Sequence, residues 1–311
     1  MNKSTLFLRR VASLAILIVL LFSSVLTAQK NDDKDKSSDK DANKSFSSFI
    51  RIHKNLKGKP AGLETSVTRY EGVNKKGEKI FVDLIGVVHI GEKDYYEKLN
   101  EIFEKYDALL YELVAPKGTK IPKGGGREGG LNPVAALQQG MQSILELEFQ
   151  LKHIDYTKEN FVHADMSPEE FLESMEKNEE SFAKMALRAI GQSMAMQNSS
   201  QMSDVDLIMA MFSDNRSYKM RQIMAKQMND MEAGMVMFNG KDGSTIIDHR
   251  NKKAFSILEK EIASGKTKLG VFYGAGHLPN MEERLFRDFG LQRAGQFWLE
   301  AWKLSADSKR K

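Results

Sequence analysis

The stretch that decides the fold is VDLIGVVHIGEKDYYEKL, Val82 to Leu99. An apolar run ends in Gly-Val-Val-His, Gly86 to His89, and a helical pattern begins almost at once. A second copy of this arrangement, LGVFYGAGHLPNMEERL, spans Leu269 to Leu285 and places His277 three residues after Gly274. Short apolar runs bounded by turn residues are typical of buried strands. Both stretches therefore predict a buried strand that ends near a histidine and leads into a helix.

The segments around these two copies alternate between strand and helix patterns. A helix is expected over Asp94 to Tyr106 and a short buried strand over Ala108 to Val114, which predicts parallel strands joined by a crossover. Further strands are expected at Glu64 to Tyr70, Glu78 to Val88, Phe161 to Asp165, Lys268 to Gly274 and Gln292 to Trp302. Further helices are expected at Asn132 to Leu151, Ile246 to Ala263 and Asn280 to Phe289. The sequence predicts an α/β (α+β) fold with a mixed, largely parallel central sheet flanked by helices.

The middle of the chain predicts a helical insertion at about residues 132–240. The residues after Asp165 carry a helix start, with Ser167 as N-cap, Pro168 in the first turn and Glu170 completing a capping box. Residues 175–237 look helical and hold most of the 17 methionines. Methionine fills irregular gaps and also suits adaptable binding surfaces. The Met-rich cap is therefore either core filler or a surface for peptide or lipid. The glycine-rich residues 124–130 predict a flexible excursion and lack the pattern of a phosphate-binding loop.

Composition limits the function classes. The chain has 311 residues and a net charge of +4, and much of the Lys and Arg excess lies near the two ends. Basic residues are not interleaved with aromatic ones in a stripe, so we expect no nucleic-acid partner. The chain contains no cysteine, which excludes disulfides, thiolate metal sites and a cysteine nucleophile.

The N-terminal 48 residues are not expected to belong to the fold. Lys3, Arg9 and Arg10 precede an apolar run from Val11 to Leu21, and small residues before Gln29 suit cleavage. Residues 1–28 therefore predict a secretory signal peptide or, because Val11 to Ala28 approaches the roughly 20 residues that span a bilayer, a signal anchor. Residues 29–48 predict a disordered charged linker, residues 49–303 the folded domain, and residues 304–311 a polar tail. Either reading of the N-terminus predicts an exported, periplasmic or secreted protein, with membrane contact only if the segment is uncleaved.

Four polar residues fall where apolar strands are predicted to end: His89, Glu112, Asp165 and His277. The carboxyl ends of parallel strands meet at one edge of a sheet, where ligands bind. Two imidazoles and a carboxylate match sites that hold Mn, Fe, Co or Zn and leave positions for water. The sequence therefore predicts a divalent metal site of His89, Glu112 and His277, with Asp165 as a possible addition or simply the start of a turn.

The neighbours of these residues have expected roles of their own. Gly86 and Gly274 lack a Cβ, which allows close approach of another element. Glu112 stands in an apolar strand, where an unpaired carboxylate is costly, so a metal, Arg250 or a histidine must compensate its charge. Arg250, followed by Asn251, offers a bidentate donor for a carboxylate or oxyanion or forms an ordinary salt bridge. The remaining histidines divide into two that look structural or exposed, His163 and His249, and two without supporting context, His53 and His153.

The ordered motifs GVVH (86–89), YEL with Glu112, HRN with Arg250 and Asn251, and GAGHLPNMEERL with His277 resemble those of the TraB/PrgY/GumN/Tiki superfamily. The resemblance covers roughly residues 82–290. It implies an α/β fold related to erythromycin-esterase-like and haem-binding ChaN-like proteins. For Tiki members it implies a divalent-metal-dependent protease that uses the two Gly-x-x-His histidines and the glutamate.

The leading prediction is an exported metal-dependent hydrolase, peptidase-like, acting on a peptide or small-molecule substrate. His89 and His277 hold the metal, Glu112 is the third ligand or the base that takes a proton from water, and Arg250 orients a carboxylate or stabilises an oxyanion. The alternative is a non-catalytic protein of the same fold that binds peptide or haem.

Overall fold

The computed structural model describes most of the chain between residues 48 and 305. The described residues are 48–124, 142–178, 180, 209–210, 212–235 and 244–305. The predicted signal segment, almost all of the predicted linker, residues 125–130 of the glycine-rich stretch, about half of the Met-rich residues 175–237 and residues 306–311 lie outside them. No helix among the described residues is long and apolar enough to span a bilayer.

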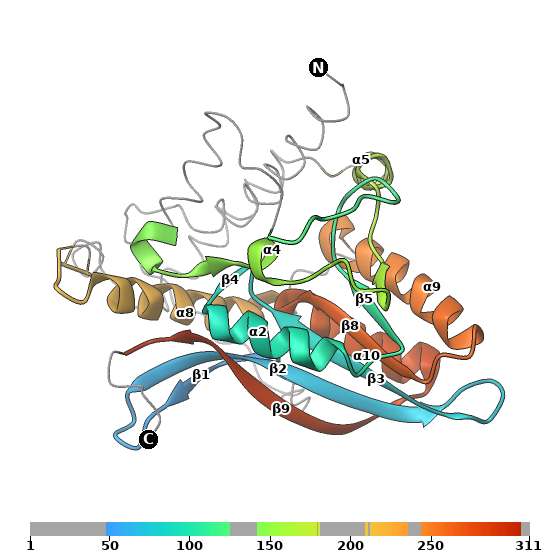
Figure 1. The fold of residues 1–311 in the computed structure, drawn as a ribbon, viewed down its shortest axis with the longest axis horizontal. Coiled ribbons are helices and arrows are strands. Elements are labelled where there is room, and N and C mark those ends of the chain that lie inside the picture. The colour runs from blue at the N-terminus through green and yellow to red at the C-terminus, as the bar shows by residue number, and fades with distance from the viewer. Residues whose placement is uncertain are drawn as a thin grey trace, which may run out of the picture.

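A seven-stranded mixed sheet forms the centre of the molecule (Figure 1). Its path runs β1-β2-β3-β8-β5-β7, and β9 pairs with β2 off this path. The strands are β1 (Ile50–Lys54), β2 (Pro60–Val73), β3 (Lys79–Val87), β5 (Ala108–Tyr111), β7 (Phe161–His163), β8 (Lys268–Gly274) and β9 (Gln292–Lys303). The prediction of a mixed, largely parallel α/β sheet flanked by helices is confirmed.

The half of the sheet that carries the predicted site is parallel. β8 lies between β3 and β5, with Val87 opposite Gly274 and Tyr111 opposite Phe272. β7 extends this half beyond β5, with Tyr111 opposite His163. The carboxyl ends of these strands therefore stop at one edge, and the residues that follow them meet there.

The other half is antiparallel. The strands expected at Glu64 to Tyr70 and Glu78 to Val88 are β2 and β3, which form a hairpin and pair from Val67–Ile85 to Val73–Lys79. β9, the expected final strand, runs along β2 from Glu71–Gln292 to Gly62–Lys303. The short strand β1 was not predicted, and it adds to the start of β2.

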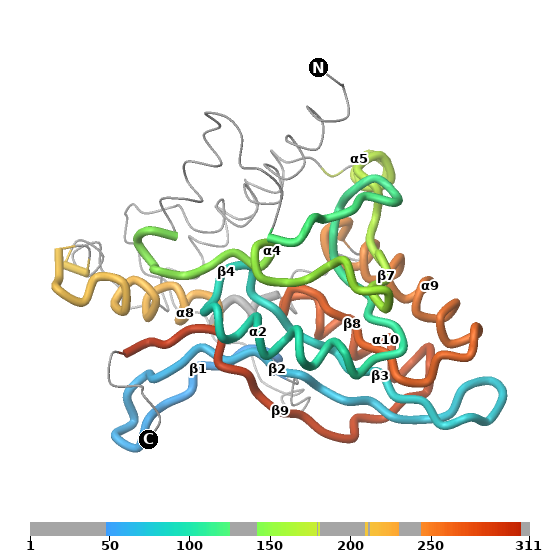
Figure 2. Tube along the Cα trace, viewed as in Figure 1, coloured from blue at the N-terminus to red at the C-terminus, as the bar shows by residue number. Residues whose placement is uncertain are grey.

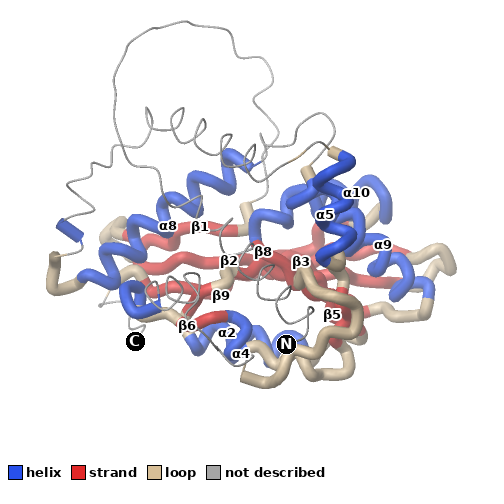
Figure 3. The backbone as a smooth tube through the Cα atoms, turned by 90° about the horizontal axis from the view of Figure 1, so that it is seen from above, coloured by secondary structure: helices blue, strands red, loops and turns tan. Residues whose placement is uncertain are grey.

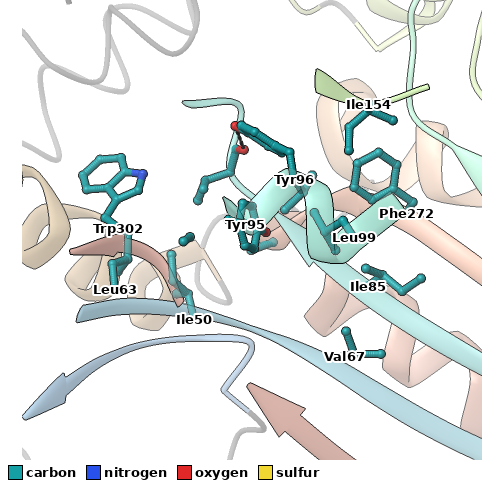
Figure 4. Close-up of a cluster of buried hydrophobic side chains, with 14 of the residues drawn as sticks. Ile50, Leu63, Val67, Ile85, Tyr95, Tyr96, Leu99, Ile154, Phe272 and Trp302 are labelled. Atoms are coloured by element: carbon teal, nitrogen blue, oxygen red, sulfur yellow. Dashed lines mark hydrogen bonds between the residues drawn. The ribbon is translucent and has the colours of Figure 1, made fainter. Parts of the chain in front are cut away.

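Successive side chains along the parallel strands point to opposite faces of the sheet, so a separate hydrophobic core lies on each face. Ile85, Leu109 and Phe272 belong to one cluster, whereas Leu84, Leu110 and Val271 belong to the other. Helix α2 (Lys93–Phe103) packs on the first face, and Figure 4 shows its tyrosines beside the strands. Helices α9 (Arg250–Ala263) and α10 (Leu278–Phe289) cover the second face.

The remaining described elements lie around this sheet and the helices on its two faces. They are β4 (Ile90–Gly91), β6 (Glu148–Phe149), α4 (Gln150–His153), α5 (Pro168–Lys177), α8 (Arg216–Met235), the π-helical turn Thr245–His249 and the 3₁₀ turn Ala275–His277. Figure 3 shows α8 beside β1, with α9 and α10 towards the other end of the sheet. Helix α5 begins with the predicted capping box of Ser167 and Glu170.

Two of the expected helices differ from the structure. The single helix expected over Asn132 to Leu151 is wrong within its described part, because Glu146 has a positive φ of 53° and residues 148–149 form β6, which pairs with β4. The helix expected from Ile246 begins instead as a π turn and becomes α-helical at Arg250. Pairing across the chain outweighs local helical periodicity in the first case.

We expect Gly270→Ala to lower the free energy of unfolding by about 1–3 kcal/mol, the usual cost of overpacking a core. A Cβ at this position of β8 would lie 2.6 Å from Leu109 Cδ1 and 3.0 Å from the Tyr106 ring, and both side chains are buried. Chemical denaturation measures the change. Gly295→Ala on β9, where a Cβ meets nothing within 4 Å, is the matched control. Equal effects of the two substitutions would contradict the tight packing described here.

Candidate functional site

Helix α2 fixes the end of β3 and thereby places His89. The hydroxyl of Tyr95 donates to the Gly86 carbonyl at 3.2 Å, and that of Tyr96 donates to the Val88 carbonyl at 2.9 Å. Both tyrosines are fully buried. The helical pattern that follows the first Gly-x-x-His motif therefore holds the motif in position.

The imidazole of His89 is oriented by Gln150 from a distant segment. Gln150 Oε1 lies 3.0 Å from His89 Nδ1, and the Gln150 backbone N–H donates to the His89 carbonyl at 2.9 Å. Gln150 Nε2 donates to the Tyr156 hydroxyl at 2.7 Å. The chain trace in Figure 2 shows α4, which begins at Gln150, passing close to β4. Sequence analysis missed Gln150, because nothing in its local pattern distinguishes it from the other glutamines.

Glu112 follows the last residue of β5 rather than lying inside the strand, which corrects its predicted placement. Its N–H donates to the Phe272 carbonyl at 3.2 Å, which keeps the backbone beside β8. Its Oε2 accepts the backbone N–H of Gly274 at 2.7 Å. The carboxylate is therefore aimed at the first Gly of the second Gly-x-x-His motif.

Gly274 marks the point around which the predicted ligands gather. A Cβ on this residue would lie 3.3 Å from Glu112 Oε2, 3.8 Å from His277 Cδ2 and 4.0 Å from His89 Nε2. The missing side chain therefore leaves space among the three predicted ligands. The equivalent glycine of the first motif has a packing role, since a Cβ on Gly86 would lie 3.3 Å from Leu278.

His277 lies in the 3₁₀ turn between β8 and α10, and Asn251 of α9 orients it. His277 Nδ1 is 2.7 Å from Asn251 Oδ1, while Asn251 Nδ2 donates to the His277 carbonyl at 3.0 Å. Asn251 Nδ2 also donates to Asn280 Oδ1 at 2.9 Å. Asn251 is completely buried, so it supports His277 and does not contact solvent.

Arg250 joins the two carboxylates of the site. Its Nε and Nη2 donate to the two oxygens of Asp165 at 2.9 and 2.6 Å, and Nη2 also donates to Glu112 Oε1 at 2.6 Å. Asp165 in turn accepts the N–H of Met166 at 2.8 Å. The buried hydroxyl of Tyr273 donates to the Ala164 carbonyl at 2.5 Å, which fixes the backbone before Asp165. Of the compensating partners considered for Glu112, Arg250 makes a direct ion pair with it at 2.6 Å.

Burial and neighbouring charges shift the pKa values of Glu112 and Arg250 in opposite directions. Burial raises the pKa of Glu112, but the charge of Arg250 and the nearby histidines outweigh it and hold that pKa well below its ordinary value. Burial lowers the pKa of His277 to about 4, so its imidazole is neutral at pH 7. Burial alone would lower the pKa of Arg250, but Asp165 and Glu112 raise it well above its ordinary value. Two carboxylates against one guanidinium leave one negative charge in excess, which favours a cation.

The types of side chain at this site suit a divalent metal, whereas their present spacing does not. Two imidazoles and a carboxylate are the ligands that Zn and similar metals take. Within the described residues, however, no three His, Asp or Glu side chains are arranged as the ligands of an ion. His277 Nε2 lies 3.6 Å from Glu112 Oε1 and 3.4 Å from Arg250 Nη1. An ion bound through His277 Nε2 would have to replace the contact of that atom with Arg250.

The members of the site differ in exposure. His89 is exposed, whereas His277, Arg250 and Asp165 are buried. His89 is therefore the most accessible of these four side chains.

The other histidines lie outside this group. His163 contacts the Leu113 carbonyl through Nε2 at 2.6 Å, and His249 lies 2.7 Å from Ser174 Oγ through Nδ1. His153 stacks on Tyr96, and His53 lies on β1. The structure thus brings together His89, Glu112, His277, Arg250, Asp165, Asn251 and Gly274 and leaves these four histidines apart.

Comparison with known proteins adds no relative: no protein-family model, curated protein or solved structure matches the chain.

We expect Arg250→Met to lower the free energy of unfolding at pH 7 by about 3–5 kcal/mol, because it leaves Asp165 and Glu112 buried without a cation. The deficit should shrink as the pH falls, since buried unpaired carboxyl groups in the variant take up protons. In the wild type the contribution of Glu112 is complete above the unfolded carboxyl pKa of about 4 and is lost as the pH falls through its lower folded pKa.

Denaturant titrations at several pH values measure this difference. Arg287→Met removes an exposed pair with Asp288 and should change stability by no more than about 0.5 kcal/mol. A deficit for Arg250→Met that stays constant between pH 7 and 4 would contradict the ion cluster.

Proposed function

We propose that the chain is an exported metal-dependent hydrolase of the TraB/PrgY/GumN/Tiki type, in which His89, His277 and Glu112 hold a divalent ion. One observation carries the proposal: the two Gly-x-x-His histidines each have Nδ1 beside a side-chain amide oxygen, and they flank Gly274 together with Glu112. Metal-ligating histidines usually donate their second ring N–H to an oxygen acceptor, a carboxylate, a backbone carbonyl or water, and amide oxygens take that place here. A bound Mn, Co, Zn or Fe ion would acidify a water molecule and polarise a carbonyl group of the substrate.

The two roles considered for Glu112 are not equally supported. A general base works best when its pKa lies near the operating pH, and Arg250 holds the pKa of Glu112 far below that. An ionised carboxylate has further lone pairs for a metal beside the hydrogen bonds from Arg250 and Gly274. We therefore assign Glu112 to metal binding rather than to proton abstraction.

Arg250 serves this site mainly by anchoring Glu112. Nε and Nη2 are committed to Asp165 and Glu112, and Nη1 lies 3.4 Å from His277 Nε2. A substrate carboxylate or developing oxyanion can be reached only through Nη1. Asp165 holds the guanidinium in place and has no proposed contact with the metal.

The proposals for the substrate and for the location of the protein do not rest on the geometry of the site. Peptide hydrolysis is proposed from the family resemblance alone, and export from the N-terminal residues 1–28, which lie outside the described part of the chain. The competing proposal is a protein that binds peptide or haem without turnover. Such a protein would use the same exposed histidine, His89.

We expect His89→Ala and His277→Ala each to weaken metal binding by more than roughly tenfold and to abolish hydrolysis. Loss of a residue that only hydrogen-bonds a metal ligand already costs about tenfold or more in affinity. The full chain, purified in detergent, is stripped of metal and reloaded with Mn, Co, Zn or Fe. Bound metal and cleavage of a peptide library are then measured. His53→Ala on β1 is the matched control and should behave as wild type.

Two results would count against the hydrolase. If the His89→Ala, His277→Ala double variant binds metal as tightly as wild type, the shared site is wrong. If wild type binds metal but cleaves neither peptides nor esters, the binding-protein proposal replaces it.

A further inference from the structure

We propose that Gln150 and Asn251 are a matched pair of positioning residues, which hold His89 and His277 in the same tautomer, with Nδ1 protonated and a lone pair left on Nε2. The two amides come from different segments, α4 and α9, yet each contacts its histidine in the same way. The purpose of this arrangement rests on the proposed metal site, whereas the tautomers themselves do not depend on a metal.

The tautomer of His277 follows from the bonds of Asn251. Asn251 Nδ2 is committed to the His277 carbonyl and to Asn280 Oδ1, so Oδ1 is the atom that faces the ring. A carbonyl oxygen only accepts, so His277 Nδ1 must carry the proton. Arg250 Nη1 approaches Nε2 from the other side, and a guanidinium only donates. Asn251 requires a proton on Nδ1, and Arg250 requires a lone pair on Nε2. Both neighbours therefore favour the same neutral tautomer.

Gln150 holds His89 at two points. Its Oε1 faces the ring Nδ1 at 3.0 Å, its backbone N–H donates to the His89 carbonyl at 2.9 Å, and its Nε2 is directed to the Tyr156 hydroxyl. Gln150 is buried while His89 is exposed, so the amide fixes the ring from the protein side. His89 Nε2, which would lie 4.0 Å from a Cβ on Gly274, is then left for a ligand.

His163 provides the contrast within the same sheet edge. It also ends a parallel strand, β7, but its Nε2 lies 2.6 Å from the Leu113 carbonyl. Nε2 must therefore carry the proton in His163, and the ring cannot offer that atom to a metal. A structural histidine and the two site histidines are thus distinguished by the tautomer that their partners impose.

The test is ¹H–¹⁵N long-range correlation spectroscopy of the ring nitrogens in the metal-free full chain labelled at histidine. We expect Nδ1–H in His89 and His277 and Nε2–H in His163. Gln150→Leu should convert His89 towards Nε2–H and weaken Zn binding by about 10–100-fold. Gln150→Glu, which keeps an accepting oxygen, should restore the Nδ1–H form of His89 and most of the affinity.

Asn251→Ala should change the tautomer of His277 and leave that of His89 unaltered, with thermal unfolding followed to show that the variant folds. Because the Gln150 variants act on an element remote from α9, they test the proposal even if Asn251→Ala does not fold. Nε2–H at His89 in the wild type, or a Gln150→Leu spectrum and Zn affinity equal to wild type, would overturn the proposal.

The same data separate this proposal from the proposed function. Predicted tautomers in a wild-type protein that takes up no Mn, Co, Zn or Fe would support the positioning role and reject the metal site. Metal binding at His89 and His277 with the opposite tautomers would support the metal site and reject the positioning role.

Discussion

The buried ion cluster of Glu112, Arg250 and Asp165 is the constraint on which the rest of the site depends. A carboxylate in this position would be costly without a cation, and Arg250 supplies one that both acids share. The cluster also connects three segments, since Glu112 follows β5, Asp165 follows β7 and Arg250 begins α9. Its one excess negative charge lies beside the two histidines, which is the charge balance on which the proposed metal site rests.

The parallel half of the sheet explains why these residues meet. β8 lies between β3 and β5, so the turns after all three strands open at one edge, and Gly274 at the end of β8 lies among them. Helix α2 fixes the β3 turn through two buried tyrosine hydroxyls, and α9 fixes the β8 turn through Asn251. Strong packing behind the edge leaves His89 as the accessible part of the site.

Much of this edge could be predicted from the sequence, because strand ends and glycine-histidine spacing are local signals. His89, Glu112, Asp165 and His277 were placed at strand ends from apolar runs alone, and Arg250 from its charge. Gln150 could not be found, since its role depends on contact with a residue 61 positions away. The turn at Glu146 and the β4–β6 pairing were missed for the same reason: local periodicity favoured a continuous helix, and pairing between distant segments determines the structure.

The most direct test of the central claim is X-ray absorption spectroscopy of the full chain loaded with one equivalent of Zn. Two imidazole nitrogens at about 2.0–2.1 Å and a carboxylate oxygen at about 2.0–2.2 Å are expected, and the imidazole signal should fall by half in each of the single variants His89→Ala and His277→Ala. A zinc shell without imidazole, or one unchanged by either substitution, would contradict the site.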